Sequence, residues 1–228
     1  MLLSQAWETY ESDKRIEGFS PQTLKAYKLQ SILLIRFFND VQIDKITTEQ
    51  LKAYLAKSSE SLKHLREACC SPMENALFEF MFSTGCQIGE VVTLDRGRIN
   101  WMNRSAIIRG KGDKEREVYF NIRCEIWLKR YLDNREDRDT AIFVTERDPH
   151  RMSIAQMRYI IKRISNRASI NKGIHPHQLR HSYATHLLNN GAPLDVIQSL
   201  LGHEKSETTR IYAQLSGSIR QQLYMKYF

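Results

Sequence analysis

The sequence predicts a mainly helical protein with one small antiparallel sheet, an α+β class. Three observations lead to this class. Capping signatures precede several amphipathic runs, apolar residues recur at helical spacing through most of the chain, and only one pair of short runs has the character of joined strands. With 228 residues, the chain is long enough to bury a sizeable core.

Residues 1–57 predict a small helical domain. Apolar residues recur at helical spacing from Leu2 to Tyr10, which indicates a first helix. Ser20-Pro21 provides an N-cap followed by proline at the first helical position, and so begins a second helix through Phe38. Thr47-Thr48-Glu49-Gln50 is a capping box for a third helix.

Residues 58–228 predict a larger second domain. A short helix is expected over residues 61–66, and a second capping box, Ser71-Pro72-Met73-Glu74, begins a helix that Gly85 ends. Residues 106–109 and 117–120 are two strands joined by a charged turn that contains two glycines. Further helices are expected at residues 126–131, at 153–168 after the Ser153 cap, and three times after His177.

The composition favours a cytoplasmic protein with an anionic partner. The formal net charge of +8 favours nucleic acid, because it steers polyanions toward the surface. No stretch approaches the roughly 20 apolar residues of a membrane span, and the first eight residues lack the features of a signal peptide. The four cysteines show no metal-ligand spacing and are expected to be reduced thiols.

Five polar residues between positions 111 and 212 supply the chemistry for attack on a phosphodiester. Arginine binds phosphate bidentately, histidine transfers protons near neutrality, and tyrosine forms a covalent phosphoester. These residue types occur at Lys111, His177, Arg180, His203 and Tyr212. Each alone has an ordinary structural explanation, and the order of the whole set favours a site. No carboxylate or cysteine completes a metal site with the nearby histidines, so neither metal nor cofactor is expected.

The motifs that carry these residues closely resemble those of tyrosine recombinases, the phage-integrase and Xer-like enzymes of bacteria and mobile elements. The matching segments are residues 83–91, 109–116, 175–187, 200–203 and 208–213. The resemblance is strong over residues 58–215 and looser over 1–57, which would be the family's helical core-binding (SAM-like) domain. That domain lacks one helix and a linker by comparison with the family.

The resemblance implies a role for each candidate residue. Tyr212 would be the nucleophile that forms a 3′-phosphotyrosine, and Lys111 would protonate the leaving oxygen. Arg180 would bind the scissile phosphate, His177 would assist proton transfer, and His203 would donate a hydrogen bond to the phosphate. Further DNA contacts are expected from Lys25, Lys28, Lys114 and Arg116.

One position departs from the family pattern. Gln87 occupies the place of the first catalytic arginine, so the transition state would lose one positive charge. Glu90 would lose a cationic neighbour with which to pair. The sequence therefore predicts a site-specific recombinase or integrase with impaired activity. A non-catalytic DNA-binding or regulatory protein and a type IB topoisomerase-like activity are the alternatives.

The C-terminal segment predicts a helix with an apolar stripe formed by Ile219, Leu223, Tyr224 and Tyr227. In the family such tails dock onto a neighbouring subunit, which implies self-association on double-stranded DNA. Packing against its own domain is the alternative.

Overall fold

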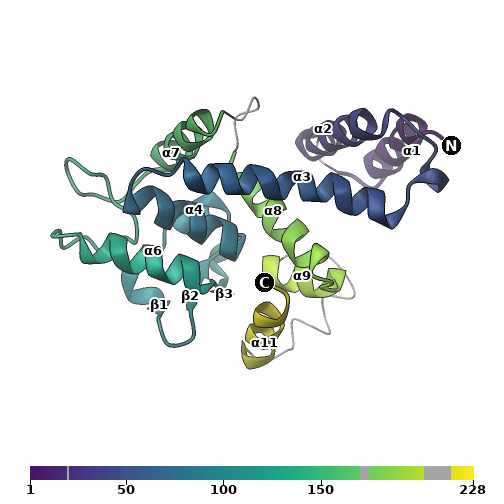
Figure 1. The fold of residues 1–228 in the computed structure, drawn as a ribbon. Coiled ribbons are helices and arrows are strands. Elements are labelled where there is room, and N and C mark those ends of the chain that lie inside the picture. The colour runs from purple at the N-terminus through teal and green to yellow at the C-terminus, as the bar shows by residue number, and fades with distance from the viewer. Residues whose placement is uncertain (20, 170–174, 203–216) are drawn as a thin grey trace. The chain divides into compact units, whose positions relative to one another are not determined.

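The computed structural model describes residues 1–19, 21–169, 175–202 and 217–228 (Figure 1). Within these ranges the chain is mostly helical and contains one small antiparallel sheet, which confirms the predicted fold class. Contacts divide it into two compact units, residues 1–58 and 59–228. None of the described helices combines the length and apolar character that a membrane span requires.

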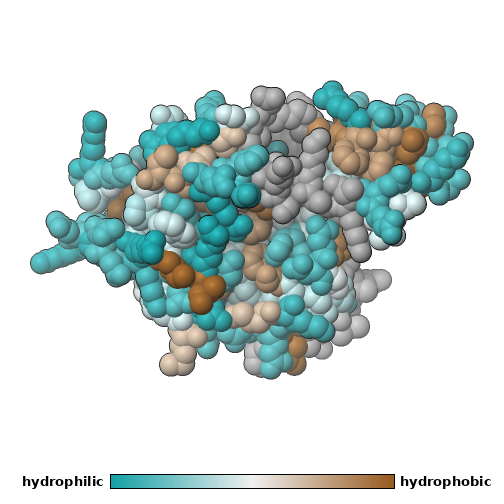
Figure 2. All heavy atoms as spheres, viewed as in Figure 1, coloured by the Kyte–Doolittle hydropathy of each residue, from teal (hydrophilic) through white to brown (hydrophobic). Residues whose placement is uncertain are grey.

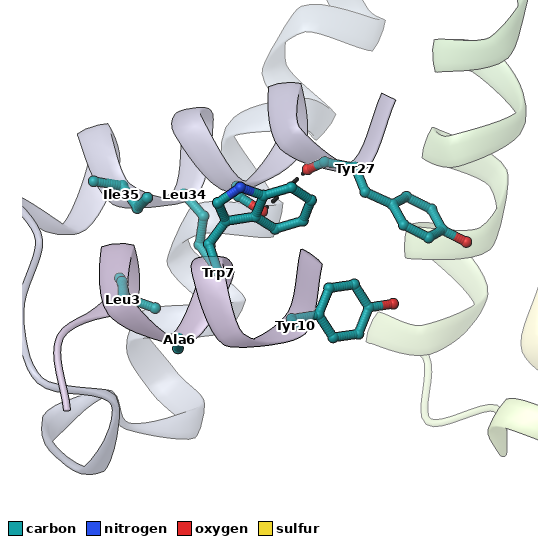
Figure 3. Close-up of a pocket in the computed structure, with 8 residues that line it drawn as sticks. Leu3, Ala6, Trp7, Tyr10, Tyr27, Leu34 and Ile35 are labelled. Atoms are coloured by element: carbon teal, nitrogen blue, oxygen red, sulfur yellow. Dashed lines mark hydrogen bonds between the residues drawn. The ribbon is translucent and has the colours of Figure 1, made fainter. Parts of the chain in front are cut away.

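The first unit begins with two helices that pack side by side, α1 (Leu3–Ile16) and α2 (Pro21–Phe38). A 3-10 turn, η1 (Ile43–Lys45), follows them. Because the unit has few elements, much apolar surface remains uncovered, and Figure 2 shows apolar atoms gathered over α1 and α2. Between these helices lies an apolar hollow lined by Trp7, Tyr10 and Tyr27 (Figure 3).

Helix α3 (Thr48–Glu67) differs from the prediction, because it is one continuous helix rather than a third helix followed by a short separate one. Its beginning is as predicted. The Thr47 hydroxyl accepts a hydrogen bond from the Gln50 N–H, and the Gln50 side chain accepts one from the Thr47 N–H. The sequence Lys57-Ser58-Ser59-Glu60 contains neither glycine nor proline, so nothing in it ends the helix.

Helix α4 (Pro72–Thr84) forms the centre of the second unit. It packs against α6 (Ile122–Asp133), α7 (Ile154–Arg167) and α8 (Pro176–Asn189), and every residue from Met73 to Thr84 is buried. Ser71 is its N-cap, and its hydroxyl accepts the Glu74 N–H at 3.2 Å. Gly85 ends the helix in the left-handed conformation, as predicted.

Two glutamates of α4 carry charge into this buried helix and are paired there. Glu74 accepts hydrogen bonds from Arg163 and Arg167 of α7, and Glu79 accepts them from Arg66 of α3. Both carboxylates are almost fully buried. These pairs fix the neighbouring helices to α4, since an unpaired buried carboxylate would be costly.

The sheet has the order β1-β2-β3, with all neighbours antiparallel. Strands β2 (Ser105–Arg109) and β3 (Glu115–Tyr119) match the predicted pair, and a 3-10 turn, η3 (Lys111–Asp113), joins them. Strand β1 (Ile99–Asn100), which follows the 3-10 turn η2 (Arg96–Arg98), was not predicted. Two residues are too few to show the alternation by which strands are recognised.

The C-terminal helices of the described chain are α8, α9 (Leu194–Leu201) and α11 (Gly217–Tyr227). The aromatic face of α11 packs within its own unit. Tyr224 is 1% exposed, donates its hydroxyl to the Ser83 carbonyl at 3.1 Å, and stacks on Phe228. This is the alternative arrangement that the sequence left open for the tail.

Candidate active site

The candidate site is built around Arg180, which joins three segments of the second unit. From α8 its Nη1 donates to the Gly85 carbonyl at 2.7 Å, and its Nη2 donates to the Leu201 carbonyl at 2.9 Å. These carbonyls lie at the ends of α4 and α9. In the described part of the chain Arg180 forms no ion pair, so two neutral groups hold its guanidinium in place.

Gly85 permits this arrangement because a larger residue would not fit. Its φ of 62° lies in the left-handed region that favours glycine. A Cβ there would lie 2.5 Å from Cδ1 of Tyr183, which is itself buried on α8 one turn beyond Arg180. The close contact between Gly85 and Tyr183 therefore brings α8 near enough for Arg180 to reach the Gly85 carbonyl.

A second arginine, Arg116 on β3, lies beside the first. Its guanidinium forms a bidentate ion pair with Glu90, in which Nη2 lies 3.1 Å from Oε2 and Nη1 donates to Oε1. Glu90 belongs to α5 (Ile88–Val92), and its Oε2 also accepts the N–H of Gln87 at 2.7 Å. The sequence predicted that Glu90 would lose a cationic neighbour, and strand β3 supplies one.

Gly202 brings the end of α9 against this second arginine. Its φ is 72°, and a Cβ at this position would lie 2.8 Å from Cδ and 2.9 Å from Nε of Arg116. Because the Leu201 carbonyl binds Arg180, the turn at residues 201–202 contacts both arginines.

The electrostatics of this cluster favour an anion. Burial lowers the pKa of Arg180, and the neighbouring charge of Arg116 lowers it further. Burial also opposes the charged form of Arg116, but its hydrogen bond and ion pair with Glu90 raise its pKa above the usual value. Both arginines stay protonated at neutral pH. Two cations and one carboxylate leave an excess of positive charge in a partly buried place, which suits a phosphate group.

The structure describes some of the remaining predicted catalytic residues fully, one in part and two not at all. His177 is exposed in the first turn of α8, three residues before Arg180, so both lie on one face of the helix. Gln87 is exposed at the N-cap of α5. The backbone of Lys111 lies in turn η3, while its side chain lies outside what the structure describes. His203 and Tyr212 also fall outside the described residues.

The predicted DNA contacts lie on both units. Lys28 is exposed on α2, and Lys25 belongs to the same helix, though its side chain is not described. Lys114 is exposed where the hairpin turn ends. Arg116 differs from these because its side chain is 16% exposed and is ion-paired with Glu90.

Sequence reasoning missed the pairing of Arg116 with Glu90 and the carbonyl contacts of Arg180. The only local signal was glycine at 85 and 202, which marks helix ends but not their partners. Among the described residues, no three metal-ligating side chains are grouped to hold a metal ion.

Comparison with known proteins identifies the family. The model of the phage integrase family matches residues 45–218. The chain is 38% identical over 161 residues to the tyrosine recombinase XerC of Oceanobacillus iheyensis, covering 67% of this chain and 52% of that protein. It is 31% identical over 216 residues to XerC of Pediococcus pentosaceus, covering 92% of this chain and 67% of that protein. The chain belongs to the phage integrase family, the tyrosine recombinases.

Solved structures show the same fold. The crystal structure of XerA recombinase superposes with a TM-score of 0.61 at 24% identity, covering 97% of this chain and 98% of that one. XerH site-specific recombinase bound to palindromic difH substrate has a TM-score of 0.56 at 25% identity, covering 72% of this chain and 50% of that one. The chain spans about half the length of several curated relatives that it matches, 52% for the XerC of O. iheyensis and 48% for the XerD of Ralstonia nicotianae.

Proposed function

We propose that this chain binds double-stranded DNA and cleaves and rejoins it at specific sites through Tyr212. The observation that carries the proposal is the arrangement of Arg180, whose guanidinium is fixed by two backbone carbonyls without an ion pair in the described part of the chain. A guanidinium held in this way retains its charge and several N–H donors for a phosphate. Family membership and the substrate-bound XerH relative support the same function.

In the proposed reaction the Tyr212 oxygen attacks the scissile phosphorus, and the bond from phosphorus to the 5′ oxygen breaks. Lys111 donates a proton to the departing 5′ oxygen, while His177 assists by accepting the proton that the Tyr212 hydroxyl loses. Arg180 and His203 donate hydrogen bonds to the non-bridging oxygens. The 3′-phosphotyrosine retains the energy of the broken bond, so a 5′ hydroxyl can displace Tyr212 and rejoin the strand without a cofactor.

Gln87 makes this reaction slower than it would be with arginine at that position. A neutral amide donates a hydrogen bond to phosphate but brings no charge to the transition state. Where no other cation takes its place, loss of one preorganised donor costs about 100- to 1,000-fold in rate. Binding suffers less, because many basic residues share the contacts with the DNA backbone.

A nicked suicide duplex tests the proposal, because loss of a short strand traps the covalent intermediate. Inverted repeats that neighbour the gene serve as candidate sites. We expect the wild-type protein to form a denaturation-resistant band with DNA, and Tyr212→Phe to bind the duplex without forming it. A wild-type protein that binds but never forms this band would instead be the non-catalytic DNA-binding protein.

We further propose that copies of the chain associate on DNA through the C-terminal tail, and that they act in the cytoplasm. The aromatic side of α11 packs on its own unit, but Ile219 and Met225 are 41% and 42% exposed. These two exposed apolar side chains, which lie on different faces of α11, are available to a second copy.

A further inference from the structure

A second guanidinium, that of Arg116, is linked to position 87 through Glu90, although it comes from a different segment of the chain. We propose that Arg116 binds the scissile phosphate together with Arg180 and supplies the charge that Gln87 lacks. This inference rests on the proposed function, because it assigns a second phosphate-binding residue to the same site.

The first argument is position. Arg116 is linked to position 87 through a single carboxylate, since Glu90 accepts hydrogen bonds from both the Arg116 guanidinium and the Gln87 N–H. Arg180 binds the carbonyl of Gly85, two residues before Gln87. Arg116 and Arg180 both contact the turn at residues 201–202. The two guanidinium groups are therefore both linked to the segment around position 87, where the family has its first catalytic arginine.

The second argument is charge. Two like charges are held close enough for Arg116 to lower the pKa of Arg180, and Glu90 compensates only one of them. In a partly buried place this excess is unfavourable until an anion arrives. A phosphate bound between the arginines removes the repulsion, so its binding has a physical driving force that a single arginine would lack.

The third argument is unused hydrogen-bonding capacity. Arginine has five N–H donors. The Glu90 pair occupies one N–H on each terminal nitrogen of Arg116, so the second N–H of each remains, whereas Nε is buried against Gly202. The ion pair thus orients Arg116 and leaves donors for a phosphate oxygen.

A purely structural role for Arg116, fixing β3 to α5, makes a different prediction. Removing Arg116 would then reduce stability and activity together, and a new cation at position 87 would restore neither. If Arg116 acts on the phosphate, arginine at position 87 replaces the missing charge. The two roles therefore differ in whether the effects of the two substitutions depend on each other.

The test compares four proteins on the nicked duplex in single turnover: wild type, Gln87→Arg, Arg116→Gln and the double variant. We expect Arg116→Gln to slow adduct formation by about 100-fold or more. Gln87→Arg should then accelerate the Arg116→Gln protein by about 100-fold, but the wild type by less than about tenfold. Equal acceleration in both backgrounds, or an unchanged rate in Arg116→Gln, would overturn the inference.

Controls separate folding from chemistry. Thermal unfolding is measured for every variant, and Arg116→Lys, which keeps the charge but not the fork, replaces Arg116→Gln if the latter does not fold. Arg116→Lys should slow adduct formation by about tenfold or more, and Gln87→Arg should again restore the rate. Arg123→Gln is the matched control, because Arg123 also pairs with a buried carboxylate, Glu79, but lies on α6. Its adduct rate should stay within about threefold of wild type.

A probe that needs no DNA cleavage separates this inference from the proposed function. Inorganic phosphate, compared with chloride at equal ionic strength, should raise the melting temperature of wild type and Arg123→Gln more than that of Arg116→Gln. A wild-type protein that forms no adduct but shows this pattern contradicts the proposed function and retains the anion site. Equal phosphate stabilisation of wild type and Arg116→Gln contradicts the anion site.

Discussion

At the scale of single residues, Gly85 does more than end a helix. It ends α4 in the left-handed conformation, contacts the Tyr183 ring, and accepts the hydrogen bond that fixes Arg180. Stability and the geometry of the site therefore depend on the same backbone position.

We expect Gly85→Ala to reduce the free energy of unfolding by about 2–5 kcal/mol. The left-handed conformation costs a non-glycine residue about 1–2 kcal/mol, and forcing a methyl group into the Tyr183 ring costs about 1–3 kcal/mol. Urea unfolding measures the difference. Gly191→Ala is the matched control, since Gly191 has a φ of 83° with nothing within 4 Å of its would-be Cβ. Equal losses in the two variants would show that the Tyr183 contact is unimportant.

The sequence predicted Gly85 as a helix end but not its contacts. A glycine after an amphipathic run is a local signal, whereas Tyr183 and Arg180 approach it only after α8 has packed against α4. The pairing of Arg116 with Glu90 was missed for the same reason, because it joins a strand to a helix across intervening structure.

At the scale of elements, α4 depends on paired charges inside the core. Burial opposes the charged form of Glu74, but the Cys70 N–H and the guanidinium groups of Arg163 and Arg167 bring its pKa below the usual value. The folded protein therefore holds this proton less tightly than the unfolded chain. Its contribution to stability is present above the unfolded pKa, near 4.5, and is lost as the pH falls through the folded pKa.

We expect Glu74→Gln to lower the free energy of unfolding at pH 7 by about 1–3 kcal/mol, because hydrogen bonds to a charged group are lost. The difference from wild type should shrink as the pH falls below 4.5. Urea unfolding at pH 7, 5 and 3 measures it. Glu125→Gln serves as control, since Glu125 pairs with half-exposed Lys129 and should matter by less than about 0.5 kcal/mol. A Glu74→Gln difference that is constant with pH would contradict this account.

The elements were predictable where their signals are local. The N-caps at Thr47, Ser71 and Ser153 each begin a helix, and the hairpin has the predicted strands. The prediction of a separate short helix over residues 61–66 was wrong, because α3 continues through these residues without a break. Serine and glutamate are compatible with a helix interior when neither glycine nor proline interrupts it.

At the scale of the whole molecule, the net charge of +8 and the position of the tail bear on assembly. With the aromatic face of α11 packed on its own unit, we expect a monomer in dilute solution without DNA and assemblies on a duplex that carries two inverted half-sites. Light scattering with and without that duplex measures this. Ile219→Asp places a charge at an exposed position of α11 and should reduce the assemblies without changing the monomer. Ile126→Asp makes the same change at a 45% exposed isoleucine of α6 and controls for charge alone. Unchanged assembly in Ile219→Asp would exclude this side of the tail.

The hydrogen bond between Arg180 and the Leu201 carbonyl has a consequence for synthesis of the protein. The Gly85 carbonyl is synthesised well before Leu201, so both anchors of Arg180 are present only after residue 201 has been added. A nascent or prematurely terminated copy that lacks Leu201 holds this arginine by one anchor alone, and Tyr212 has yet to be added.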